Sequence, residues 1–173
     1  MTSAQNTTRS IIQGEHAVSN DHNLTITTLL GSCVAACIYD PVLKIGGANH
    51  FLLPDAGNGP SDIRYAAAAI EVLINSLLRA GAHKRRLEAK LFGGARIMPN
   101  LPDIGRSNAL AAEKFLTTEG IPVVARDVGG QLARRLRFWP TTGLVRIQRL
   151  DPQKTLPVET PRSASTQQIE LFN

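Results

Sequence analysis

The chain has 173 residues, of which 43% are hydrophobic and 19% are charged. This length and composition are typical of one soluble globular domain with a sizeable core. No stretch approaches the roughly 18 consecutive apolar residues that a membrane-spanning helix needs, so we expect no membrane insertion. The net charge of +5 comes with only five Phe, two Tyr and one Trp. Because stacking on bases needs aromatic side chains, we expect no nucleic-acid partner, and an acidic protein suits the charge better.

The N-terminal residues and the cysteines indicate the cellular compartment. Residues 1–16 hold no apolar segment of the kind found in secretory signals. The two cysteines of the chain, without an export signal, indicate free thiols in a reducing compartment. We therefore expect a cytoplasmic protein.

Composition divides the chain into three parts. Residues 1–20 are polar and aperiodic and predict a mobile N-terminal arm. Residues 151–173 contain three prolines and a Ser/Thr/Gln run, which predicts a loose C-terminal tail because little apolar surface offsets the ordering entropy. The last part of this tail, residues 169–172, is a small apolar patch that could dock elsewhere. Residues 21–150 remain as a single folded domain.

The expected elements follow from hydrophobic periodicity and from turn residues. In chain order they are strands at 24–30, 33–39 and 45–53, a helix at 61–80, a strand at 87–92, a helix at 108–118, and strands at 123–127, 132–138 and 144–148. The first helix is expected to begin at an N-cap of Ser61 or Asp62 and to end at Gly81. This order is not a doubly wound βαβ repeat, and it predicts an α+β layered fold with a mixed β-sheet core and two main helices.

Cys33 is the first candidate for chemistry. It follows Gly31-Ser32, and glycine there can break the strand and bring backbone N–H groups close to a ligand. A free cysteine by itself is more often a small buried hydrophobe than a nucleophile. The choice between these interpretations depends on what lies beside the thiol.

A hairpin would place a histidine beside this thiol. If strand 33–39 pairs with strand 44–51 around the four-residue loop 40–43, paired positions sum to 83 and Cys33 lies opposite His50. Opposed Cβ atoms are roughly 4.5–5.5 Å apart, within reach of a thiol–imidazole hydrogen bond. A slip of one residue would destroy this alignment.

Such a pair could perform nucleophilic catalysis. A neighbouring imidazole favours the thiolate–imidazolium form, the thiolate attacks a carbonyl carbon, and the imidazolium protonates the leaving amine. A third group normally orients the imidazole, and the nearest polar candidates are Thr27 and Thr28, which could equally be ordinary strand residues. Asn49 should point to the opposite face of its strand from His50.

Cofactor binding has little support in the sequence. On a strand, Cys33 and Cys37 would lie roughly 13 Å apart, too far to bind one metal ion. The remaining histidines show no ligand spacing, so we expect no metal. The glycine pairs at 46–47, 93–94 and 129–130 form neither a GxGxxG nor a Walker sequence, so we expect no nucleotide cofactor. The pair at 93–94 could let backbone amides face the active site.

Several short segments of the sequence resemble a known protein family. LLGSCVAACIYDP (29–41), GGANHFLLP (46–54) and AKLFGGA (89–95) are similar to the chemoreceptor glutamine deamidase family, CheD. So are Arg64-Tyr65 in the long helix and the later segment DVGG (127–130), followed by Arg134-Arg135. The likeness runs over about residues 24–148. The combination is specific, because a Gly-Ser-Cys turn is followed by Asn-His 17 residues on and then by Lys-Leu-Phe-Gly-Gly.

The resemblance implies a function and roles for residues. Members of the family hydrolyse particular glutamine side chains on methyl-accepting chemotaxis receptors, without a cofactor. The resemblance implies a thioester on Cys33, His50 as the general base, and Thr27 as the third member of the triad, although the adjacent Thr28 keeps that position open. It also implies a layered α/β fold and, in some bacteria, a CheC-type phosphatase as a partner. Residues 21–150 would then be the catalytic domain.

Two features keep other interpretations open. Ile104-Gly105-Arg106-Ser107-Asn108 displaces by one position the arginine of the family's usual string, and Ala133-Arg134 replaces a Gly-Arg. Both could alter recognition of a substrate or partner.

The alternative function is a non-enzymatic adaptor of the same fold, which binds receptors or a CheC-type phosphatase. For the enzyme, the cluster Arg134-Arg135-Arg137 is expected to attract an acidic receptor surface, unless these arginines merely solvate a strand.

Overall fold

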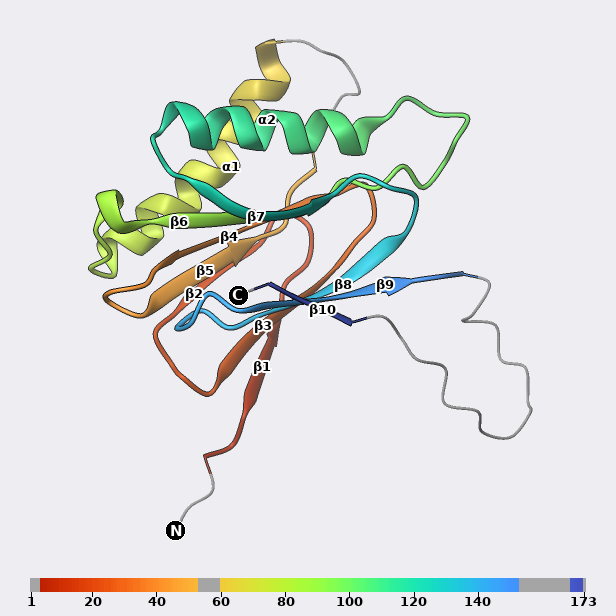
Figure 1. The fold of residues 1–173 in the computed structure, drawn as a ribbon. Coiled ribbons are helices and arrows are strands. Elements are labelled where there is room, and N and C mark those ends of the chain that lie inside the picture. The colour runs from red at the N-terminus through yellow and green to blue at the C-terminus, as the bar shows by residue number, and fades with distance from the viewer. Residues whose placement is uncertain (1–3, 53–59, 153–168, 173) are drawn as a thin grey trace, which may run out of the picture.

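The computed structural model describes residues 4–52, 60–152 and 169–172. Within these residues the chain forms ten β-strands and two α-helices, together with one short 3₁₀ helix (Figure 1). In chain order the elements are β1 (Thr7–Ser10), β2 (His16–Ser19), β3 (Leu24–Leu30), β4 (Val34–Asp40), β5 (Ile45–Asn49), α1 (Pro60–Arg79), η1 (Lys84–Arg86), β6 (Glu88–Gly93), α2 (Ile104–Thr118), β7 (Val123–Val128), β8 (Ala133–Phe138), β9 (Val145–Leu150) and β10 (Ile169–Phe172).

The strands form two five-stranded sheets. Sheet A has the order β1-β3-β8-β9-β10, and sheet B has the order β2-β5-β4-β6-β7. Each sheet is mixed, because β1 runs parallel to β3 in sheet A and β6 runs parallel to β7 in sheet B, whereas the other neighbours are antiparallel. The predicted α+β fold with two main helices is therefore confirmed, with two sheets in place of one.

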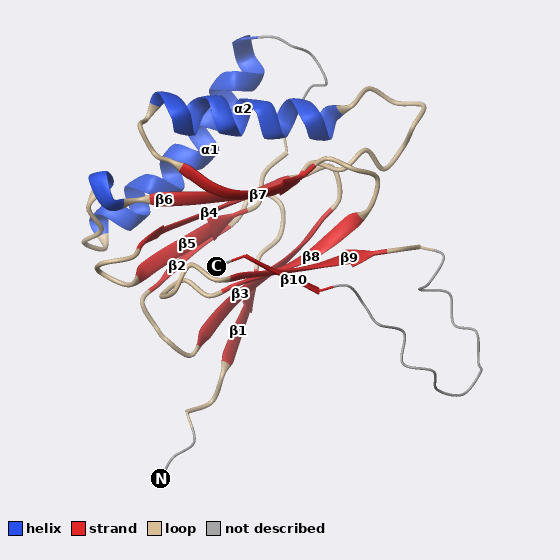
Figure 2. Ribbon diagram, in the orientation of Figure 1, coloured by secondary structure: helices blue, strands red, loops and turns tan. Residues whose placement is uncertain are grey.

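The sheets and helices stack in three layers (Figure 2). Both helices cover one face of sheet B, and sheet A covers the other face. Strand β4 lies at the centre and is buried on both faces. Its side chains alternate, as a strand requires. Val34, Ala36 and Ile38 pack in the core beneath the helices, whereas Ala35 and Cys37 pack in the core between the two sheets.

The N-terminal segment differs from the expected mobile arm. Strand β1 extends the edge of sheet A beside β3, and β2 extends the edge of sheet B beside β5. Ile11 and Ala17 are buried here, each 3% exposed. These strands are short, with few apolar residues, so the sequence carries no periodic signal for them. Their backbone hydrogen bonds are made to the edges of sheets, so these strands depend on the tertiary structure.

The last residues of the chain also join a sheet. Strand β10 pairs antiparallel with β9, and the ring of Phe172 meets that of Phe92 edge-on at 5.4 Å between centroids. The apolar patch predicted at residues 169–172 therefore docks on sheet A. The prediction of a loose tail at residues 153–168 lies outside the described residues.

Most predicted elements lie within a few residues of their observed bounds, but α2 begins four residues earlier than expected, at Ile104. Asp103 caps its start, because its side chain accepts a hydrogen bond from the backbone N–H of Arg106. The sequence did not predict this first turn of the helix, because glycine at position 105 disfavours a helix. The structure uses Gly105 for close packing, since an added Cβ would collide with the backbone of Gly94.

The predicted hairpin register between β4 and β5 is wrong by two positions. Asp40 pairs with Ile45 and Cys37 pairs with Ala48, so the paired positions sum to 85 and the loop is residues 41–44. Asp40 decides this, because its Oδ1 accepts hydrogen bonds from the backbone N–H groups of Val42 and Leu43, both at 3.0 Å. The shift is even, so the same side chains still share each face.

Candidate active site

Cys33 lies in the loop between β3 and β4, and this loop is held from two directions. The backbone N–H of Gly94, at the end of β6, donates to the Cys33 carbonyl at 2.8 Å, and that of Ala95 donates to the Gly31 carbonyl at 3.0 Å. From α2, the Asn108 side-chain amide donates to the Ser32 carbonyl at 3.0 Å. The backbone that carries the thiol is therefore fixed by β6 and α2.

The glycine pair at 93–94 allows this close approach. Gly93 has φ +104 and Gly94 has φ +66, conformations that other residues rarely adopt. A Cβ at Gly93 would collide with the Cys33 carbonyl oxygen. The sequence predicted that amides of this segment could face the active site. In the structure, the Gly94 amide holds the backbone of Cys33.

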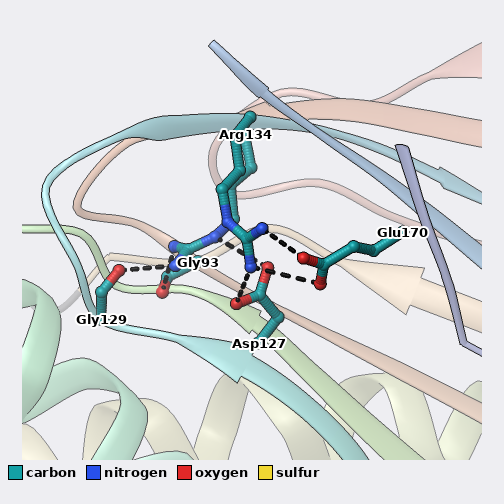
Figure 3. A network of polar contacts seen from close by, with 6 residues as sticks. Gly93, Asp127, Gly129, Arg134 and Glu170 are labelled. Atoms are coloured by element: carbon teal, nitrogen blue, oxygen red, sulfur yellow. Dashed lines mark hydrogen bonds and ion pairs between the residues drawn. The ribbon is translucent and has the colours of Figure 1, made fainter. Parts of the chain in front are cut away.

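A buried arginine supports the same segment (Figure 3). Arg134, which is 3% exposed, donates to the carbonyl of Gly93 at 2.8 Å and to that of Gly129 at 2.5 Å. It also pairs with Asp127 at 3.3 Å. Arg149 links Asp127 to Glu170 of β10. A single side chain from sheet A thus joins the two glycine turns behind the Cys33 loop.

The arginine cluster predicted to attract a receptor is divided between two faces. Because neighbouring strand residues point in opposite directions, Arg134 turns inward, whereas Arg135 and Arg137 are exposed on the outer face of sheet A. Arg134 is therefore unavailable to a partner at long range. Any electrostatic attraction by this strand belongs to Arg135 and Arg137.

His50 follows β5 and is buried, with 7% of its surface exposed. Its Nδ1 lies 2.7 Å from the Thr28 hydroxyl, and that hydroxyl donates to the carbonyl of Ile11 at 2.7 Å. A hydroxyl has one proton to donate, and the Ile11 carbonyl can only accept. The Thr28 oxygen therefore accepts from a protonated Nδ1, which leaves Nε2 as the basic nitrogen of the imidazole.

Thr28, and not Thr27, is the threonine at His50. Thr27 donates its hydroxyl to the carbonyl of Leu136 at 2.8 Å, and it lines a hollow of sheet A with Arg135 and Arg137. Adjacent strand residues face opposite ways, so only one of the two can reach the histidine. As expected, Asn49 points away from the site, since its side-chain amide donates to the carbonyl of Ala69 in α1.

Cys33 and His50 lie on the same face of sheet B but not directly opposite each other. The isolated bridge between Val34 and Phe51 places His50 two positions along from the point facing Cys33. Such diagonal neighbours are about 7–8 Å apart. Rotation of the cysteine side chain or entry of a substrate carbonyl between them would complete the contact, because catalytic hydrogen bonds are often long before a substrate binds.

The site keeps both groups uncharged at neutral pH. Burial raises the pKa of the Cys33 thiol above its ordinary value of 9.0. Burial lowers the pKa of the His50 imidazole below its ordinary value of 6.5. Both directions favour a thiol and a neutral imidazole over the thiolate–imidazolium pair expected from the sequence. The proton therefore has to move as the thiol attacks.

The N-terminal turn contributes contacts that sequence reasoning missed. The Cys33 thiol donates to the side-chain oxygen of Gln13 at a sulfur–oxygen distance of 3.8 Å. The backbone N–H of Gly14 donates to the His50 carbonyl at 2.8 Å, and the His50 N–H donates to the Glu15 carbonyl at 3.1 Å. In the sequence, the local sign of a turn at this place was Gly14. In the structure this glycine has φ +89.

Cys37 has the character of a packing residue, as expected. It is fully buried between the two sheets and lies opposite Lys90 in the register. Burial raises the pKa of its thiol far above the usual range. A thiol that water cannot reach and that resists ionisation is a poor nucleophile.

Cys33 opens onto a cleft with an apolar rim. The cleft has a volume of about 330 Å³ and is lined by the Cys33 loop and by residues 95–105. Ile97, Met98 and Leu101 line it and remain 48%, 61% and 51% exposed. Ile97 packs directly over Gly31, where an added Cβ would lie 3.5 Å from its Cγ1.

The described residues show neither a cluster of metal ligands nor a membrane-spanning helix. In the described part of the chain, three or more His, Cys, Asp or Glu side chains do not gather in a way that could hold a metal ion. None of the described helices is long and apolar enough to cross a membrane.

A cleft thiol near a buried histidine, which a threonine orients, is the arrangement of a candidate cysteine hydrolase. Comparisons with known proteins identify the family. The family model described as "CheD chemotactic sensory transduction" matches residues 52–149. A relative from Caulobacter vibrioides (strain NA1000 / CB15N) is 54% identical, over 94% of this chain and 91% of its own. Relatives from Acidiphilium cryptum (53% identical; 94% of this chain, 92% of its own) and Agrobacterium fabrum (48%; 87% and 86%) are similar. All three are named "Probable chemoreceptor glutamine deamidase CheD". The chain belongs to the CheD family.

Two solved structures share a distant likeness to this fold. The Bacillus licheniformis hypothetical protein YfiH has a TM-score of 0.41 at 14% identity, over 73% of this chain and 60% of its own. The Neisseria meningitidis protein NMB0706 has a TM-score of 0.45 at 12% identity, over 72% and 64% of the two chains.

Proposed function

We propose that this protein is a glutamine deamidase that converts glutamine side chains of bacterial chemoreceptors to glutamate and ammonia in chemotaxis. Membership in the CheD family over most of the chain supports this activity. The structural observation that carries the proposal is the His50–Thr28–Ile11 hydrogen-bond chain. It leaves Nε2 of a neutral imidazole as the free base on the face that carries the Cys33 thiol.

In the proposed mechanism, His50 Nε2 takes the proton of Cys33 as the sulfur attacks the carboxamide carbon. The carbonyl oxygen becomes an oxyanion. The backbone N–H groups of Ser32 and Cys33 have no hydrogen-bond acceptor within the described ranges. They are therefore available to stabilise that charge.

Collapse of this intermediate breaks the carbon–nitrogen bond. The proton held by His50 passes to the leaving nitrogen, so ammonia departs and a thioester with Cys33 remains. His50 then activates a water molecule, which hydrolyses the thioester to glutamate and restores the thiol. Each step uses side chains, backbone amides and water, so the mechanism includes no cofactor.

The cleft supports a protein substrate over free glutamine. Free glutamine carries a carboxylate and an ammonium group in addition to its carboxamide. Arg96 in the cleft lining could pair with the carboxylate, but the lining residues include no acidic side chain for the ammonium group, and the rim of Ile97, Met98 and Leu101 is apolar. A glutamine on the surface of a receptor helix brings neighbouring side chains that can cover apolar residues. Exposed apolar residues around a reactive group are typical of protein recognition.

Two finer features of the function follow from the family resemblance alone. We propose a CheC-type phosphatase as a second partner and the cytoplasm as the place of action. The strings that carry the resemblance, GSC at 31–33 and NHF at 49–51, support both. Co-purification of a phosphatase from the source cells, with and without receptor fragments as competitors, would test the partner.

Mass spectrometry of receptor fragments tests the activity directly. Wild-type protein should convert specific glutamines to glutamate and release ammonia, with and without EDTA. Cys33→Ala should abolish the conversion, whereas Cys37→Ala, the matched control, should retain most of it. Equal loss in both cysteine variants, or a requirement for added zinc, would contradict the mechanism. Unchanged activity in Cys33→Ala would contradict Cys33 as the nucleophile, whereas wild-type protein that binds receptor fragments without converting any glutamine would support the adaptor role.

A further inference from the structure

The side chain nearest to the nucleophile in the hydrogen-bond network is itself a glutamine. Gln13 directs its carboxamide oxygen at the Cys33 thiol, with 3.8 Å between Sγ and Oε1. A carboxamide of this kind is the group on which the proposed function acts. Gln13 is exposed, so its side chain is not confined there by burial.

A tight turn presents Gln13 to the site. The backbone N–H of Glu15 donates to the Ile12 carbonyl at 3.0 Å, and Gly14 has φ +89. Positive φ at the third position identifies a type II turn, with Gln13 at the second position. The Glu15 carboxylate reinforces the turn by accepting from the Ile12 N–H at 2.9 Å.

The same turn is fastened to the proposed base and to its orienting threonine. Gly14 and Glu15 exchange backbone hydrogen bonds with His50, at 2.8 Å and 3.1 Å. Ile11, at the start of the segment, accepts the hydroxyl proton of Thr28 at 2.7 Å. The turn therefore holds the backbone of Gln13 at a fixed place relative to the thiol and the imidazole. This keeps its carboxamide within reach of Cys33, and such positioning raises the effective concentration of a reacting group.

We propose that Gln13 is a substrate of its own chain and that Cys33 deamidates it to glutamate. This inference rests on the proposed function. The Cys33 sulfur bonds to the side-chain carbonyl carbon of Gln13 as its proton passes to His50, and the carbon–nitrogen bond then breaks to release ammonia. Water hydrolyses the resulting internal thioester. The net change is one glutamine plus one water giving one glutamate plus one ammonia.

The modification changes the electrostatics of the site. A carboxylate at position 13 lies beside the thiol, and a like charge there disfavours the thiolate. Alkylation of Cys33 by iodoacetamide is therefore slower in Gln13→Glu than in Gln13→Ala at the same pH. Self-deamidation would thus lower the reactivity of the nucleophile in the matured protein.

Peptide mass spectrometry of the purified protein tests the proposal. Position 13 should be glutamate in wild-type protein and glutamine in Cys33→Ala and in His50→Gln. The exposed Gln5 and Gln131 are internal controls and should stay glutamine in all three. When Cys33→Ala is mixed with wild-type protein, its Gln13 should persist, because the reaction occurs within one chain.

Each contrary outcome is decisive. If wild-type protein converts receptor glutamines while its own position 13 stays glutamine, self-deamidation is overturned and the proposed function stands. Equal conversion of Gln13 in wild type and in Cys33→Ala would mean spontaneous deamidation, which also overturns the proposal. Conversion of Gln13 in Cys33→Ala only upon mixing would overturn the reaction within one chain. Inactivity toward both receptor and Gln13 would overturn the proposed function as well.

Discussion

The two ends of strand β4 use buried polar groups in opposite ways. At the Asp40 end, the carboxylate is fully buried and has partners on both oxygens, from Val42, Leu43, His83 and Arg86. At the Cys33 end, the backbone carbonyls of the loop are satisfied. Among the described residues, the hydrogen-bond contact of the thiol is the one to Gln13, and Nε2 of His50 has no partner there.

This difference separates stability from function. Buried polar groups whose hydrogen bonds are all made inside the protein stabilise the fold. Removing one of them leaves its partner buried without a hydrogen bond or without a counter-charge. Groups left without partners cost stability and are available to a substrate. We therefore expect changes at the Asp40 end to affect unfolding and changes at the Cys33 end to affect turnover.

After the loss of activity in Cys33→Ala, the largest effect is expected from His50→Gln. Loss of the base should lower kcat by about 10² to 10⁴-fold, the usual contribution of general acid–base catalysis. Circular dichroism and the melting temperature should stay close to the wild-type values, because glutamine can keep a hydrogen bond to Thr28. Retention of most activity would show that another group accepts the Cys33 proton.

In the wild-type protein, the pH dependence of activity should report on the Cys33 end of β4, and the pH dependence of stability should report on the Asp40 end. Only neutral His50 can accept a proton, and burial lowers its pKa below 6.5. Therefore kcat/KM should fall about tenfold per pH unit on the acid side of that pKa and stay level through neutrality. Burial alone would raise the pKa of Asp40, but hydrogen bonds from Arg86 and from three backbone N–H groups outweigh it and hold this pKa below its ordinary value of 3.8. Because a depressed carboxyl pKa contributes stability that is lost only as pH falls through it, Asp40 keeps its contribution where activity declines. A fall in activity that coincides with unfolding by circular dichroism would contradict this assignment.

Asp40→Ala tests the closed end of the strand. The change removes the charge partner of Arg86 and the acceptor for three backbone amides, so we expect a loss of about 3 kcal/mol in the free energy of unfolding. Urea titration measures it, and Asp40→Asn, which keeps some acceptors, should lose less. Activity per folded molecule should be unchanged. A selective loss of kcat with normal stability would mean that the Asp40 end also serves catalysis.

The two adjacent threonines form a matched pair. Thr28→Val removes the hydroxyl that fixes the His50 tautomer, and the loss of one such hydrogen bond should lower kcat about tenfold. Thr27→Val removes a hydroxyl that bonds to Leu136 on the far side of the strand and should leave kcat unchanged. Steady-state kinetics of both variants give the answer, and equal effects would show that orientation of His50 does not depend on Thr28.

The smallest effect is expected from the outer face of sheet A. Arg135→Glu should lower kcat/KM on acidic receptor fragments several-fold at low salt, and the difference should shrink as screening increases. The exposed Arg85 provides a control with the same charge change near the Asp40 end. A similar loss in Arg85→Glu would assign the effect to net charge and not to a particular face.

Much of the fold could be predicted from local patterns. Periodicity identified both long helices and the central strands, and the Gly-Ser-Cys turn identified the candidate nucleophile. Strands β1 and β2 could not be predicted, because they gain their hydrogen bonds from sheet edges that exist only after folding. The register of the β4–β5 hairpin was wrong, since turn length alone does not reveal that Asp40 ends its strand by capping the turn.

The sequence by itself determined the family, the α+β class with two main helices, and a candidate loop cysteine with a histidine 17 residues later. Tertiary structure decided which groups meet. Thr27 and Thr28 are chemically identical neighbours, and only the packing of sheet A against sheet B makes one face of β3 the inner face. In the same way, Gln13 reaches Cys33 because β1 and β2 attach to different sheets and carry their connecting turn across the site. Side-chain identity is local, whereas the choice of face and neighbour depends on the whole folded chain.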